Sequence, residues 1–169
     1  TGSTAVGRRI ATQAGGTLAR TQLEMGGKNP MVILRDADIA LASQDAAIGA
    51  YSCAGQWCTA TSRLIVEEPV ADSLIDAVLA HVRAIRVGAG FAPSSTMGPV
   101  AGEVQLRSVM GHLDRARQQG ANFAAGGGRC AGGGLENGCF IEPSLIVNAG
   151  ECLDAAREIH SDQSFFEEA

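Results

Sequence analysis

Short apolar runs alternate with longer amphipathic segments along most of this chain, and this alternation restricts the fold more than any other feature. Three runs have the length and apolar character of strands: 31–34, which we expect to be buried, 63–67 and 140–147. Four longer segments carry apolar residues at helical spacing: 5–14, 37–51, 69–85 and 102–119. Strands that alternate with helices predict an α/β layered fold.

Residues that begin and end helices support these segments. The turn Gly2-Ser3-Thr4 has hydroxyl groups that can cap the first helical segment, which two glycines at 15–16 bring to an end. Asp36 is expected to cap the second segment, and Pro69 is expected to open the third. These residues therefore predict where three of the four helices start.

Two parts of the chain fit neither pattern. Glycine triplets at 126–128 and 132–134 predict a flexible surface connection. The final stretch, 161–169, is polar apart from two phenylalanines, and we expect it to have no clear partner in the fold. No internal repeat is visible in the sequence.

Composition narrows the class of protein. The 169 residues are 46% hydrophobic and 18% charged, which excludes a disordered or fibrous chain and fits one domain or part of a larger protein. The net charge of -5 and the absence of a basic patch argue against nucleic-acid binding. No apolar run is long enough to span a membrane, and we find no signal peptide. Because the chain opens with Thr1 rather than Met, we expect a piece of a larger protein, with a processed mature chain as the alternative.

The cysteines and histidines do not predict a metal site. The five cysteines are an odd number without a disulfide or zinc spacing: Cys53, Cys58, Cys130, Cys139 and Cys152. We interpret them as reduced thiols in a cytoplasmic protein. No ligand pair is formed by the three histidines, which are His81, His112 and His160. A Cys-His catalytic dyad lacks an obvious group to orient either histidine.

Cys58 is the sharpest candidate for chemistry. It lies in the segment Gly55-Gln56-Trp57-Cys58-Thr59, at or near the expected start of a helix. Helix N-termini favour the thiolate form of cysteine, and the thiolate is the nucleophile. The alternative interpretation is a buried structural cysteine, because free cysteines are among the most buried residues.

A second and a third motif also carry candidate groups. Glu24 lies between apolar residues directly before two glycines, and a partly buried carboxyl group suits a general base; a surface glutamate at a strand end is the alternative. Lys28 is either a surface ammonium group or helps to fix the turn. The turn at Gly2, Ser3 and Gly7 can bind a phosphate at a helix start, although a simple helix cap explains it as well.

Taken together and in order, these motifs resemble those of the NAD(P)-dependent aldehyde dehydrogenase superfamily, from Thr1 to about Ile159. The opening Thr1-Gly2-Ser3-Thr4 is similar to the family's F-T-G-S-T-x-x-G. The segment 23–30 reads L-E-M-G-G-K-N-P and resembles E-L-G-G-K-N-P. The segment 54–59 reads A-G-Q-W-C-T and resembles the nucleophile motif G-Q-x-C. Met97-Gly98-Pro99 and the segment 138–143 look like later family landmarks.

The resemblance implies a mechanism. The Cys58 thiolate would attack an aldehyde carbonyl, a hydride would pass to the nicotinamide of NAD or NADP, and Glu24 would activate water to hydrolyse the resulting thioester. The backbone N–H of Cys58 would form half of an oxyanion hole. Gly2, Ser3 and Gly7 would bind the cofactor near its pyrophosphate, and Glu158 would hold the nicotinamide ribose.

The resemblance also implies an architecture. It predicts a three-layer α/β catalytic domain over 26–169, incomplete at its C-terminus, preceded at 1–25 by the end of a dinucleotide-binding domain. It implies a small-molecule aldehyde substrate, a homo-oligomeric parent enzyme and a cytoplasmic location without nucleic-acid or membrane partners. The segment from Cys58 to Glu68 looks most like α-ketoglutaric semialdehyde (2,5-dioxovalerate) dehydrogenases.

Three departures from the family pattern bear on function. Most of the dinucleotide-binding domain and the C-terminal strands are missing, so we expect little dehydrogenase activity from the chain alone. Cys53 stands where relatives often have Asn, and Trp57 either shapes an aldehyde pocket or packs. Relatives continue as E-E-I-F-G-P, whereas His160 follows Ile159 here. Two alternatives stay open: an inactive remnant, or an esterase or thioesterase that uses Cys58 without a cofactor.

Overall fold

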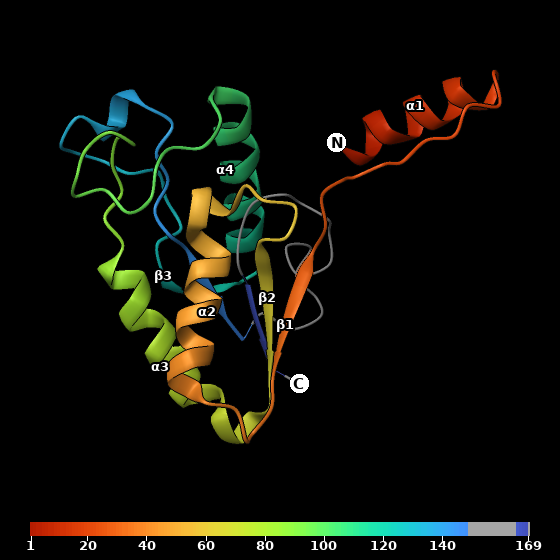
Figure 1. Cartoon of the computed structure of the whole chain (residues 1–169). Helices are drawn as coiled ribbons and strands as arrows, with labels where there is room; N and C mark the ends of the chain where they lie inside the picture. The colour runs from red at the N-terminus through yellow and green to blue at the C-terminus, as the bar shows by residue number, and fades with distance from the viewer. Residues whose placement is uncertain (149–164, 169) are drawn as a thin grey trace.

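The computed structural model describes residues 1–148 and 165–168. Within these residues the chain forms a five-stranded sheet in the order β1-β2-β5-β4-β3 (Figure 1). The strands are β1 (Asn29–Ile33), β2 (Thr61–Val66), β3 (Asn122–Ala125), β4 (Leu145–Val147) and β5 (Phe165–Glu168). The α-helices are α1 (Thr4–Gly15), α2 (Ile39–Tyr51), α3 (Glu68–Ala84) and α4 (Glu103–Gln118). Strands and helices alternate through β1, α2, β2 and α3, so the α/β prediction is confirmed.

The sheet is mostly parallel. β1 pairs with β2 and β2 pairs with β5 in parallel, β5 continues in parallel to β4, and only β3 runs antiparallel to its neighbour. Two strands were not expected from the sequence, β3 and β5. The prediction that 161–169 has no partner is wrong for β5, because this strand pairs with both β2 and β4 at the centre of the sheet.

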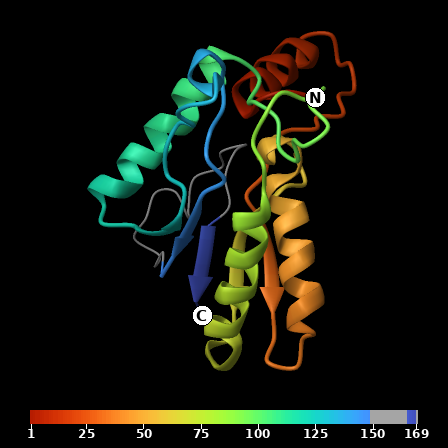
Figure 2. The same cartoon turned by 90° about the vertical axis from the view of Figure 1, so that its left-hand side faces the viewer.

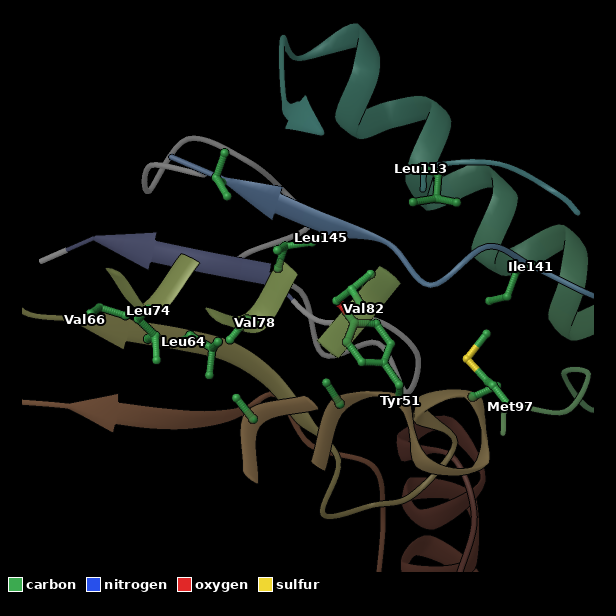
Figure 3. Packing of buried hydrophobic residues seen from close by; sticks show 14 of the residues in the cluster. Tyr51, Leu64, Val66, Leu74, Val78, Val82, Met97, Leu113, Ile141 and Leu145 are labelled. Carbon is green, nitrogen blue, oxygen red and sulfur yellow. The ribbon is translucent and has the colours of Figure 1, made fainter. Parts of the chain in front are cut away.

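Helices α2 and α3 lie side by side over one face of the sheet, and both Figure 1 and Figure 2 show this arrangement. Strict alternation of burial along β2 sends Leu64 and Val66 to that face. There they point toward Leu74 and Val78 of α3 (Figure 3). The apolar stripe of α4, which includes Leu113, joins the same buried cluster. One continuous core therefore fixes β2 and α2, the two elements that flank the segment around Cys58.

Two element boundaries differ from the prediction. Asp38, not Asp36, caps α2, because its carboxylate Oδ1 accepts a hydrogen bond from the Leu41 N–H at 3.1 Å. The expected strand over 140–147 is reduced to β4. Upstream of β4, Ile141 makes only an isolated bridge to Arg129. Only the end of this apolar run joins the sheet. In the run 31–34, which was expected to be buried, Ile33 is buried, whereas Val32 and Leu34 are 60% and 54% exposed.

The first glycine-rich stretch is held in place rather than forming a flexible surface connection. The N–H of buried Gly127 donates to the Ser144 hydroxyl at 2.8 Å, and the Glu142 N–H donates to the Gly128 carbonyl at 2.9 Å. Gly126 has a φ of 61°, and a Cβ atom there would lie 2.5 Å from the Pro143 carbonyl oxygen. Glycine is therefore required at 126 by close packing as well as by backbone conformation.

Helix α1 stands apart from the sheet at the end of an extended segment (Figure 1). Of the two hydroxyl groups in the turn at 2–4, that of Ser3 caps the helix, accepting from the Val6 N–H at 3.3 Å. Gly7 is the one buried residue of α1, and a Cβ atom there would meet the Met25 sulfur at 2.4 Å. Among the described residues, no helix is both long and apolar enough to cross a membrane.

Candidate functional site

The turn that follows α2 has an unusual backbone. Helix α2 ends at Tyr51, and a single 3-10 turn, Ser52–Gly55, follows it. Cys53, Ala54 and Gly55 have φ values of 52°, 56° and 74°, so three successive residues lie in the left-handed region. Only glycine adopts this conformation without steric cost. Such strain persists where the surrounding structure holds it, and it is common at functional sites.

Cys58 lies on an irregular turn between this 3-10 turn and β2. The prediction that it sits at a helix start is wrong, because the chain extends into β2 at Thr61, three residues later. A helix dipole therefore does not act on this thiol. The Cys58 side chain is exposed, so the alternative of a buried structural cysteine does not apply to it.

Two carboxamide side chains pin the segment on either side of Cys58. Gln56 Nε2 donates to the Cys53 carbonyl at 2.8 Å, while Gln56 Oε1 accepts from the Ala101 N–H at 2.8 Å. Asn29 Nδ2 donates to the Cys58 carbonyl at 2.7 Å and to the Ala60 carbonyl at 3.1 Å. These contacts supply the fixed geometry that regular secondary structure does not provide here.

Tyr51 ties the start of the turn to a neighbouring loop through its side chain. Its side chain is buried, and its hydroxyl donates to the Ser144 carbonyl at 3.0 Å. Burial raises the pKa of Tyr51, so the phenol stays neutral and acts as a donor. The turn is therefore attached to the loop that leads into β4.

Lys28 is half-buried next to the site. Burial, and then the charge of Arg63, lower the pKa of Lys28 from 10.5 to about 8. Arg63 Nη2 also donates to the Lys28 carbonyl at 3.2 Å. The Lys28 ammonium group is thus partly removed from solvent, and its role in fixing the turn stays a prediction, since the bond from Arg63 reaches the main-chain carbonyl.

Glu24 meets the N-terminal turn. The Gly2 N–H donates to the Glu24 carbonyl at 3.0 Å, and Gly2 pairs with Met25 in an isolated parallel bridge. Gly2, Gly7 and Glu24 line one small hollow, and the Glu24 side chain is exposed. The structure thus brings the predicted base together with the predicted cofactor turn. Within the described residues, no hydrogen bond joins the carboxyl group of Glu24 to Cys58.

The remaining predicted residues are distributed as follows. Cys53, Cys58, Cys130 and Cys139 are free cysteines in the structure, and their reduced state in the cell stays a prediction. His81 lines a pocket of about 270 Å³ between α2 and α3. Within the described part of the chain, no three His, Cys, Asp or Glu residues are grouped closely enough to hold a metal ion. Glu158, Cys152 and His160 lie outside the described residues.

Comparison with known proteins identifies the family. The aldehyde dehydrogenase family model matches residues 1–159. The chain belongs to the aldehyde dehydrogenase family. It is 34% identical to an α-ketoglutaric semialdehyde dehydrogenase of Bacillus subtilis and to a betaine aldehyde dehydrogenase of Brucella ovis, each over 158 residues. Each match covers 94% of this chain and 32% of the relative, so the chain spans about a third of the length of these aldehyde dehydrogenases.

Solved aldehyde dehydrogenase structures share the fold. Betaine aldehyde dehydrogenase of Staphylococcus aureus in complex with NAD+ has a TM-score of 0.94 and 33% identity over 99% of this chain and 34% of that one. An apo form of that enzyme, a point mutant, has a TM-score of 0.93 and 34% identity with the same coverage, and one of its cysteines is modified by β-mercaptoethanol.

Sequence reasoning missed the roles of Asn29 and Gln56, although both stand inside the aldehyde dehydrogenase motifs. The available signal was their residue type, because each is a carboxamide next to a glycine-containing turn. Such side chains can form hydrogen bonds with backbone N–H and C=O groups that have no partner in an irregular segment. The sequence does not specify which carbonyl groups they reach, since Asn29 and Cys58 are 29 residues apart.

Proposed function

We propose that this chain carries the nucleophile and the water-activating base of an enzyme that oxidises an aldehyde to a carboxylate with NAD(P)+. The observation that carries the proposal is an exposed thiol at Cys58 on a strained turn that is pinned on both sides by carboxamides. Family membership supports the reaction class. We further propose that residues 1–25 end a dinucleotide-binding domain and that 26–169 belong to a three-layer catalytic domain.

The chemistry that these residues supply is covalent. The Cys58 thiolate adds to the aldehyde carbon, and the carbonyl oxygen becomes an oxyanion. The Cys58 N–H makes no hydrogen bond within the described residues, so it is available to stabilise this oxyanion. After oxidation, the Glu24 carboxylate takes a proton from water, the water oxygen attacks the thioester carbon, and the C–S bond breaks to release the acid and the thiol.

The start of α1 fits a nicotinamide dinucleotide. The first turn of any helix presents free N–H groups and a positive dipole end, which suit a pyrophosphate. Ser3 caps this turn, and Gly7 allows α1 to approach the segment that carries Glu24. When bound, NAD(P)+ supplies the hydride acceptor for the oxidation. Glu158 remains a proposed ribose ligand.

The substrate is proposed only as a small aldehyde. The curated relatives include enzymes named for α-ketoglutaric semialdehyde and for betaine aldehyde, and the chain is 34% identical to each, so identity favours neither. The α-ketoglutaric semialdehyde interpretation therefore stays a prediction. Trp57 is 49% exposed next to Cys58, and we propose that its ring borders the aldehyde site rather than packing in the core.

Acylation of Cys58 by p-nitrophenyl acetate tests the nucleophile without a cofactor. In this reaction the thiolate displaces p-nitrophenolate, and the acetyl group remains on sulfur. We expect peptide mass spectrometry to find acetyl on Cys58 well before it appears on Cys53, which is also exposed. Cys58→Ala should abolish the rapid phase of p-nitrophenolate release. Equal acetylation of the two thiols would contradict the proposal.

A second assay separates the redox reaction from simple ester chemistry. An aldehyde and NAD(P)+ are added to the chain, and NAD(P)H absorbance is followed. We expect no turnover from these 169 residues, because the described part of the cofactor region is the single helix α1 with its turn. Turnover by the chain alone would overturn the expectation that it cannot enclose a dinucleotide.

A further inference from the structure

We propose that Asn29 is a positioning residue that fixes the peptide group of Cys58 to the segment that carries Glu24. This inference rests on the proposed function, because it assigns to Asn29 the task of keeping the nucleophile and the base in register. The hydrogen bonds of the Asn29 side chain that the structure shows go to main-chain carbonyls rather than to the thiol. Asn29 acts through the main chain of Cys58, whose carbonyl accepts its side-chain hydrogen bond at 2.7 Å.

The carboxamide of Asn29 is held firmly. Its two N–H donors go to two different carbonyls, those of Cys58 and Ala60, at 2.7 Å and 3.1 Å. On the other side, a Cβ atom at Gly27 would lie 3.0 Å from Asn29 Oδ1, so the glycine leaves room for the amide. The Ser62 hydroxyl donates to the Asn29 carbonyl at 3.3 Å, which fixes the main chain as well.

Asn29 lies at the end of the sheet, where the pairing of β1 with β2 begins. It pairs with Thr61 at the first position of the β1–β2 ladder, and the register shifts between Asn29 and Pro30. Beyond this point, among residues 1–148 and 165–168, no strand hydrogen bonds hold the chain toward Cys58. The Asn29 side chain therefore extends the pairing of β1 into the turn, on carbonyls that the ladder does not reach.

The hydrogen bond from Asn29 to Cys58 joins two segments that have no regular secondary structure of their own. Glu24 precedes Asn29 by five residues on a segment without helix, and Cys58 lies on a turn without helix or strand. Neither segment can hold the other in register through its own secondary structure. Displacements of about 1 Å at a reacting group lower rates by up to ~10²-fold, so a hydrogen bond between the two segments has a direct effect on chemistry.

The test compares two reactions of the same thiol in the purified 169-residue chain. Acylation by p-nitrophenyl acetate depends on the orientation of the Cys58 N–H toward the oxyanion, whereas alkylation by iodoacetamide forms no oxyanion and reports on thiolate content and exposure. We expect Asn29→Ala to slow acylation about tenfold and to change alkylation less than about twofold. Asn29→Asp keeps the size of the side chain but presents no donor, so it should lower the ratio of acylation to alkylation in the same way.

Two residues of the chain, Asn137 and Cys130, serve as controls for this comparison. Asn137→Ala, at an exposed asparagine, should leave both rates unchanged, and buried Cys130 should stay unreactive in every variant that folds. An unchanged acylation rate in both Asn29 variants, an equal fall in both reactions, or reaction of Cys130 would overturn the positioning role. If the unsubstituted chain does not acylate Cys58 ahead of Cys53, the proposed function itself fails. That result is distinct from an effect of Asn29.

Discussion

The Asn29 side-chain amide donates to the Cys58 carbonyl oxygen at 2.7 Å, and this bond joins two segments that are 29 residues apart in the sequence. One segment carries Glu24, and the other carries the thiol. Neither lies in a helix, and the turn at 53–55 has a strained backbone. The segment around Cys58 is thus tied to the end of the sheet by the side-chain amide of Asn29, rather than by strand pairing.

Replacing Cys53 should relieve backbone strain. Cys53 has a φ of 52°, a region that Asn tolerates better than most side chains. We expect Cys53→Asn to raise the free energy of unfolding by about 0.5 kcal/mol. Cys53→Val, the matched control, should lower it by about 1 kcal/mol, because β-branched residues fit this region poorly. Urea unfolding measures both variants, and equal stabilities would refute the strain argument.

Removing the Gln56 amide should loosen the turn. Gln56→Ala deletes the bonds to the Cys53 carbonyl and to the Ala101 N–H, at an expected cost of about 1 kcal/mol in the free energy of unfolding. Hydrogen exchange of the Ala101 amide should accelerate in the same variant. Gln13→Ala, at an exposed position on α1, is the control and should leave that amide unchanged. Unaltered exchange at Ala101 would show that Gln56 does not link the two loops.

Substitution of Tyr51 tests the hydrogen bond that joins the start of the turn to Ser144. Tyr51→Phe keeps the buried ring and leaves the Ser144 carbonyl without its donor. We expect a loss of about 1–3 kcal/mol in the free energy of unfolding, because a buried acceptor loses its partner. Denaturant unfolding with an unchanged m-value would attribute the loss to native stability. A variant as stable as the original would mean that this hydrogen bond contributes nothing.

Lys28 makes stability depend on pH. The pKa of Lys28 is lowered from 10.5 to about 8 in the folded chain, chiefly by burial. Between about pH 8 and pH 10.5, Lys28 is therefore protonated in the unfolded chain but mostly neutral in the folded chain. The contribution of Lys28 is therefore unfavourable below about pH 8, by up to about 3 kcal/mol, and this penalty fades as the pH rises to about 10.5. The stability difference between the original chain and Lys28→Met should narrow over this range.

The single lysine permits a direct check. Lys28 is the only lysine in the sequence, so ¹³C-labelling of lysine gives one side-chain resonance. Its NMR titration should have a midpoint near the lowered pKa of about 8. A midpoint near 10.5 would show that the ammonium group is solvated, and the stability difference from Lys28→Met would then not change with pH.

Much of the fold could be predicted from the sequence, because burial leaves a periodic signal. The apolar stripe with Leu74 and Val78 identifies α3, and the run that includes Leu64 identifies β2. β5 was missed because Glu167 and Glu168 hide a central strand in a polar stretch. The choice of Asp38 over Asp36 as the α2 cap depends on backbone geometry that composition does not record.

The candidate site was predictable in its chemical groups but not in its geometry. The motif around Cys58 predicts a nucleophile, yet it wrongly indicated a helix start, since a cysteine after a glycine-containing turn fits a helix cap as well as a strained loop. The contacts of Asn29 and Gln56 are long-range, and no periodicity encodes which carbonyl a carboxamide reaches. Such contacts require the folded structure.

Hydrolysis of acetyl-Cys58 is the most direct test of the pairing between the thiol and Glu24. The chain is acetylated at Cys58, excess ester is removed, and loss of the acetyl group is followed by mass spectrometry at neutral pH. We predict that Glu24→Gln slows this loss at least ~10²-fold, as expected when a general base is removed, while Glu136→Gln, at an exposed glutamate, leaves the rate unchanged. Equal rates of hydrolysis in the Glu24→Gln variant and the original chain would contradict the assignment of Glu24 as the base that serves Cys58.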